Sequence, residues 1–69
     1  MRGLAFSSLR VGSKYRIINF GDRNEFIVEK VLPGGDFAVK DLLTLERYKL
    51  KDLIKFGRGK DFEISEMEA

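Results

Sequence analysis

DLLTLERYKLKDLIKFG, residues 41–57, is the stretch that decides between two folds for this chain. A helical interpretation has some support, because Asp41 would be an N-cap, Lys55 would lie in the last turn and Gly57 would be the C′ residue. At about 100° per residue, however, the large apolar side chains of residues 42–56 spread over roughly 240° of the helix, with charged side chains inside that arc. A peripheral helix should have a narrower apolar face.

The same stretch fits a turn, a strand and a short helical turn better. Tyr48 and Leu50 would then lie on the inner face of a sheet, and Arg47 and Lys49 on the outer face. Residues 52–54 would form the helical turn that follows. We therefore favour the strand over the helix.

The segments on both sides of this stretch have the composition of strands. They are rich in aromatic and β-branched residues or alternate between apolar and polar ones. The sequence Pro33-Gly34-Gly35-Asp36 predicts a turn, because Pro presets φ and Gly accepts a positive φ. The predicted strands are Tyr15–Phe20, Glu25–Leu32, Asp36–Asp41, the strand containing Tyr48, and Asp61–Ser65.

With 69 residues, the chain is expected to form a single domain over residues 1–69. Residues 1–13 are interpreted as a lead-in whose Leu4, Phe6 and Leu9 pack against the domain, residues 14–65 as the β-barrel, and residues 66–69 as a frayed acidic end. The predicted core is Ile17, Phe26, Val28, Phe37, Val39, Tyr48, Leu50, Leu53, Phe62 and Ile64.

This order of strands and turns resembles small SH3-like barrels, including Tudor-like ones, over residues 13–65. The most specific part is residues 40–53, which look like a distal hairpin followed by the short 3₁₀ turn that precedes the last strand in such barrels. The resemblance implies a mainly β fold, a small five-stranded barrel. The alternative is an α+β fold with a three-stranded meander and one helix over residues 42–56.

The ligand motifs of the well-known SH3-like families are missing. No ALYDY-like segment and no tryptophan is present, so an aromatic groove for polyproline is not indicated. A Tudor-like cage for methyl-lysine would need several aromatic side chains around one mouth. Tyr15, Phe20, Tyr48 and Phe56 could supply them, but we interpret these aromatic residues as core.

Composition limits the chemistry that is open to the chain. It has no Cys and no His, which excludes thiolate metal sites, imidazole ligands and Cys or His catalysis. The Gly57-Arg58-Gly59-Lys60 segment is not a Walker A loop, because Asp61 follows Lys60. We expect no enzyme activity, no cofactor, no metal and no small-molecule substrate. No apolar run approaches the roughly 18 residues that cross a bilayer, so a cytoplasmic location and no membrane partner are expected.

Two candidate binding surfaces remain, and they imply a non-catalytic binding or assembly module. Excess leucine after the third strand predicts an apolar interface for a protein partner or for self-association, the function we favour. The alternative is nucleic-acid binding, to RNA or single-stranded DNA, by a basic surface in residues 47–60. The candidate apolar interface is Leu42, Leu43 and Leu45. The candidate basic surface is Arg47, Lys49, Lys51, Lys55, Arg58 and Lys60.

Overall fold

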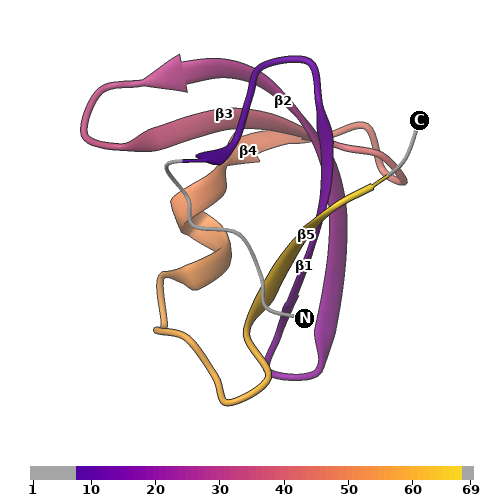
Figure 1. The fold of residues 1–69 in the computed structure, drawn as a ribbon, viewed down its shortest axis with the longest axis vertical. Coiled ribbons are helices and arrows are strands. Elements are labelled where there is room, and N and C mark those ends of the chain that lie inside the picture. Colours follow the sequence, from indigo (N-terminus) through magenta and orange to yellow (C-terminus); the bar gives the residue numbers. More distant parts are fainter. Residues whose placement is uncertain (1–7, 68–69) are drawn as a thin grey trace.

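The computed structural model describes residues 8–67 as one five-stranded antiparallel sheet with a short 3₁₀ segment (Figure 1). The strand order across the sheet is β4-β3-β2-β1-β5. Along the chain, the elements are β1 (Lys14–Asn19), β2 (Asp22–Leu32), β3 (Asp36–Asp41), β4 (Arg47–Lys49), the 3₁₀ segment η2 (Leu50–Ile54) and β5 (Glu63–Glu66). The prediction of a mainly β fold is confirmed.

The stretch that decides the fold is a turn, a short strand and a 3₁₀ segment. Strand β4 pairs with β3, with Tyr48 opposite Val39. A helix over residues 42–56 is therefore wrong: the backbone of residues 47–49 forms a ladder with β3, which leaves no continuous helical bonding. Leu50 points into the core as expected, although it begins η2 rather than continuing the strand.

Two turns with positive φ connect the first three strands. Phe20 and Gly21 join β1 to β2, with φ of 52° and 78°, as type I′ hairpins require. Gly34 and Gly35 lie between β2 and β3 with φ of 80° and 77°. At these positions Gly adopts the left-handed conformation without a steric penalty, whereas Phe20 does not.

Strand β2 is the longest element and bends along its length. Its register against β3 shifts between Val28 and Lys30, which marks a β-bulge at Glu29. The first half of β2 runs beside β1, and the second half runs beside β3 in a different direction (Figure 1). This bend wraps the sheet around its own inner face.

The sheet is not closed into a barrel, which corrects the expectation of a barrel over residues 14–65. Within residues 8–67, no ladder joins the two edge strands β4 and β5. The physical reason is that β4 has three residues and then turns into η2, so it never runs beside β5. Leu50 at the start of η2 is fully buried and packs into the core on the open side.

The core lies on the inner face of the curled sheet. Seven of the ten predicted core residues are buried, and Tyr48, Leu53 and Phe62 pack against them while partly exposed. The alternation of buried side chains along β1 and β3 explains the accuracy of this prediction. The buried apolar residues are Leu9, Tyr15, Ile17, Phe26, Val28, Phe37, Val39, Leu50 and Ile64.

The segments before β1 and after Ser65 agree with the sequence interpretation only in part. Leu9 packs in the core as the lead-in interpretation predicted, whereas Leu4 and Phe6 lie outside the described residues. Tyr15 is buried because its hydroxyl accepts a hydrogen bond from the backbone N–H of Arg10 at 2.9 Å. The frayed end was placed too early, since Glu66 belongs to β5 and Met67 N donates to Lys14 O.

The packing of η2 gives the first testable prediction. Leu50→Ala should lower the free energy of unfolding by about 2–5 kcal/mol, because Leu50 is 0% exposed and its loss leaves a cavity. Leu43→Ala is the matched control, and it should change stability by no more than about 0.5 kcal/mol because Leu43 is 89% exposed. Urea denaturation measures both. Equal effects of the two substitutions would contradict this packing.

Candidate functional site

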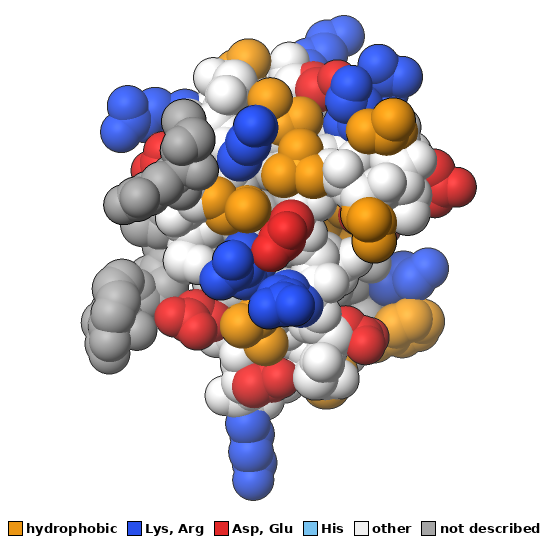
Figure 2. All heavy atoms as spheres, turned by 90° about the vertical axis from the view of Figure 1, so that its right-hand side faces the viewer, with side chains coloured by type: hydrophobic (Ala, Val, Ile, Leu, Met, Phe, Trp, Pro, Cys, Tyr) orange, Lys and Arg blue, Asp and Glu red, His pale blue; other side chains and the backbone are white. Residues whose placement is uncertain are grey.

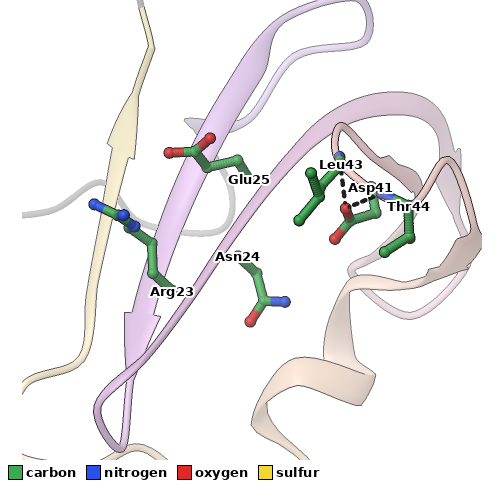
Figure 3. A pocket seen from close by; sticks show the side chains of 6 residues that line it. All are labelled: Arg23, Asn24, Glu25, Asp41, Leu43 and Thr44. Carbon is green, nitrogen blue, oxygen red and sulfur yellow. Dashed lines mark hydrogen bonds between the residues drawn. The ribbon is translucent and has the colours of Figure 1, made fainter.

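The loop between β3 and β4, residues 42–46, is ordered by the buried side chain of Asp41. One carboxylate oxygen accepts hydrogen bonds from the backbone N–H groups of Leu43 and Thr44, at 2.8 and 2.9 Å (Figure 3). The other oxygen accepts the Tyr48 hydroxyl at 3.3 Å. The Asp41 carbonyl also accepts from Leu45 N at 3.0 Å. The loop therefore has one well-defined backbone conformation.

These contacts shift the pKa values of both side chains. The backbone N–H of Thr44 holds the pKa of Asp41 below its usual value, against the opposing effect of burial, and Leu43 N–H and the Tyr48 hydroxyl lower it further. Burial, and then the charge of Asp41, raises the pKa of Tyr48 to about 12. Near neutral pH, Asp41 is charged and Tyr48 is a hydrogen-bond donor.

The same loop presents two leucines to solvent. Leu43 is 89% exposed and Leu45 is 63% exposed. Leu45 also has a φ of 66°, in the left-handed region that a leucine rarely occupies. Leu42 is half-buried, and its N–H donates to the Glu25 carbonyl at 2.9 Å. Leu43 and Leu45 are thus the exposed part of the candidate apolar interface. We call the loop that carries them, residues 42–46, the leucine loop.

A hollow of about 340 Å³ lies beside the leucine loop. Figure 3 shows Asn24 on the side of β2 that faces the loop, whereas Arg23 and Glu25 lie on the other side. Glu25 accepts a hydrogen bond from Arg16 at 3.1 Å, and Asp41 is engaged by the loop. The Glu25 and Asp41 carboxylates beside the hollow are therefore both engaged in contacts within the protein. The residues that line the hollow are Arg23, Asn24, Glu25, Asp41, Leu43 and Thr44.

Exposed apolar side chains are mixed with charges on the neighbouring surface. The right-hand side of Figure 1, where the loop after β3 projects, faces the viewer in Figure 2. Hydrophobic side chains gather over the upper half of that face, between acidic and basic ones (Figure 2). This face therefore carries apolar and charged side chains in an intermixed arrangement.

The six residues of the candidate basic surface fall into two groups. The first lies on β4 and the start of η2. Arg47 donates to Glu29 at 2.9 Å, and Lys51 Nζ donates to the Gly34 carbonyl at 2.8 Å. Arg47 and Lys49 also line a wide, shallow hollow of about 580 Å³. Two of the three cations in the first group, Arg47 and Lys51, therefore already make contacts within the protein.

The second group lies at the other end of the molecule, in the loop that joins η2 to β5 (Figure 1). Lys55 Nζ lies 5.4 Å from the centre of the Phe56 ring. The Arg58 guanidinium lies 4.8 Å from the centre of the Phe62 ring. Lys60 is exposed. Residues 47–60 therefore follow one side of the molecule, but they do not converge on a single site.

The four aromatic residues considered for a methyl-lysine cage correct one sequence interpretation. Tyr15 is buried and Tyr48 is half-buried, as core residues are. Phe20 is 60% exposed and Phe56 is 84% exposed, so assigning them to the core was wrong. Phe20 lies in the two-residue turn between β1 and β2, and not in a strand as the predicted range Tyr15–Phe20 had it.

Neither a metal centre nor a membrane span emerges from the described part of the chain. Over residues 8–67, no three carboxylates gather in a way that could hold a metal ion. No helical segment in the same range is long and apolar enough to cross a bilayer. The leucine loop and the two basic groups therefore remain as the candidate sites.

The Tyr48–Asp41 contact predicts an alkaline loss of stability. The folded pKa of Tyr48, about 12, lies above the usual value of 10.0. Burial of Tyr48 and then the charge of Asp41 cause this shift, so the stabilising contribution of the protonated hydroxyl is fully present below pH 10.0 and is lost as the pH rises toward about 12. Urea denaturation of the wild type and of Tyr48→Phe across alkaline pH measures it. The difference in stability should shrink over this range, and a constant difference would contradict the contact.

Comparison with known proteins gives this chain no relatives. No family model, no curated protein and no solved structure matches it.

Proposed function

We propose that this chain is a non-catalytic protein-binding module that makes its contact through the leucine loop. The observation that carries the proposal is the 89% exposure of Leu43 on a loop whose backbone is fixed by Asp41. An exposed leucine contributes nothing to folding. On a partner, its burial would contribute about 1.5–3 kcal/mol.

Backbone strain at Leu45 supports the same surface. A leucine at φ 66° costs on the order of 1–2 kcal/mol, and Gly or Asn would occupy this position more easily. Its 63% exposure means that burial within the chain offsets little of that cost. Burial against a partner would offset it.

The fixed loop favours binding for a second reason. Ordering flexible side chains and loops is a large part of the cost of association, and a loop already held by hydrogen bonds avoids most of it. A stable interface buries about 800 Å² on each partner, so the two leucines would form its centre. Glu46, which is exposed and directly follows Leu45, would form part of the polar rim.

The proposal includes an SH3-like fold and a cytoplasmic location. The strand order β4-β3-β2-β1-β5 and the 3₁₀ segment before β5 support an SH3-like architecture of the open kind. Strand order alone does not assign a function, because one fold hosts many. The function therefore rests on the leucine loop.

Site-specific photocrosslinking tests the proposal in cells that express the full chain. A photoreactive residue at position 43 should give a discrete product with a protein partner, and the same residue in place of Val31 should not. Val31 is the matched control because it is also apolar and is 60% exposed. Leu45→Asn should abolish the product at position 43 without unfolding, since Asn tolerates a positive φ. Equal products at both positions, or no effect of Leu45→Asn, would contradict the proposal.

The captured protein is then identified and titrated against the purified domain. Leu43→Ser should weaken that affinity at least about tenfold, which corresponds to the loss of about 1.4 kcal/mol of apolar contact. Sedimentation at rising concentration shows whether the partner is a second copy of this chain. An affinity that is unchanged by Leu43→Ser would remove the leucine loop as the contact surface.

A further inference from the structure

A second surface lies at the end of the molecule where the β1–β2 turn meets the loop between η2 and β5. These two segments lie side by side in Figure 1, and hydrogen bonds join them. They carry two exposed aromatic rings and three cations. We call this surface the aromatic tip, and it consists of Phe20, Lys55, Phe56, Arg58 and Lys60.

Phe20 is an unusual residue for its place in the turn. Type I′ turns need a positive φ at both central residues, and Asn-Gly is the common choice. Phe20 instead occupies this position with a φ of 52° and is 60% exposed. Neither the turn nor the core explains a phenylalanine here. Strained backbone positions of this kind cluster at functional sites.

The turn is fixed by Asp61 and by close packing. The two carboxylate oxygens of Asp61 accept hydrogen bonds from the N–H groups of Phe20 and Gly21, at 2.8 Å each. The Phe20 ring lies so close to Gly59 that a Cβ atom there would be 2.9 Å from the ring. The ring is therefore held in place, with its other side open to solvent.

The neighbouring loop is fixed by the buried side chain of Asn19. Its amide nitrogen donates to the carbonyls of Gly57 at 3.1 Å and Leu53 at 3.4 Å, and its oxygen accepts from Gly59 N at 2.7 Å. Phe56, directly before Gly57, is 84% exposed. Two aromatic rings are thus presented by two segments that share one set of hydrogen bonds.

The loop that carries Phe56 is rich in cations. Residues 55–60 contain Lys55, Arg58 and Lys60 and no acidic residue. Lys55 places its ammonium beside the Phe56 ring, 5.4 Å from its centre. Asp61, the acidic residue that follows, directs its carboxylate at the two N–H groups of the turn.

We propose that the aromatic tip binds single-stranded nucleic acid. Bases would stack on Phe20 and Phe56, and Lys55 and Lys60 would contact the phosphates. Exposed rings beside cations are the combination that recognises single strands, because every base has a face to stack and every nucleotide carries a phosphate. In a duplex the bases are already stacked on each other, so no base would be free to stack on the Phe20 and Phe56 rings. This proposal does not depend on the leucine loop, which lies elsewhere.

Fluorescence anisotropy with labelled oligothymidylate and oligouridylate tests the proposal on the full chain. The wild type should bind both, and a duplex of equal length should bind more weakly. Phe20→Asn and Phe56→Ser should each weaken binding about tenfold, within the range for the loss of one stacked base. Phe20→Asn should fold at least as stably as the wild type, since Asn suits the turn. Its loss of binding therefore could not come from unfolding.

Two matched controls separate stacking and local charge from a general attraction. Val31→Asn removes another apolar side chain of 60% exposure and should leave binding unchanged. Lys55→Ala with Lys60→Ala should flatten the log–log salt dependence by about 0.7 for each lost contact, and Arg47→Ala with Lys49→Ala should flatten it less. No binding at low salt, equal affinity for the duplex, unchanged binding by both Phe variants, or equal effects of the two charge pairs would overturn the proposal.

Discussion

The bend in β2 is the constraint on which the rest of this structure depends. A chain of 69 residues can bury only a small core, so one sheet must cover several sides of it. The bulge at Glu29 lets β2 pair with β1 in its first half and with β3 in its second. Phe26 and Val28, just before the bulge, are both fully buried. A flat sheet would leave the inner faces of β1 and β3 too far apart to share that core.

Two buried polar side chains then determine the shape of the two loops for which we propose binding roles. Asn19 and Asp41 lie at the ends of β1 and β3, and both are almost fully buried. A buried polar group must be hydrogen-bonded, and each of these finds its partners in the backbone of a loop. The same interaction that satisfies the side chain holds the loop in one conformation. Each of these loops presents large apolar side chains to solvent.

The structure divides the candidate basic surface that the sequence predicted. The cations of residues 47–60 are close in sequence, but β4, η2 and the following loop distribute them along the length of the molecule. Arg47 is paired with Glu29 on the outer face of the sheet, where an exposed ion pair contributes about 0–1 kcal/mol. The cations of residues 47–60 therefore form two separate groups with different neighbours in the structure. In the second group, Lys55 lies beside the exposed ring of Phe56.

The sequence by itself determined that there are five strands, the inward faces of most of them, the glycine turn after β2 and the 3₁₀ segment, but it began β2 at Glu25 instead of Asp22 and so missed the turn at Phe20 and Gly21. These features depend on local alternation and backbone preference, which neighbouring residues carry. It also pointed to Leu43 and Leu45 as surplus apolar residues. Only the tertiary structure decided that Phe20 and Phe56 are exposed and that Asn19 and Asp41 organise loops. Asn19 is the clearest case, because its partner Gly59 lies 40 residues away, and no local pattern encodes a hydrogen bond over that separation.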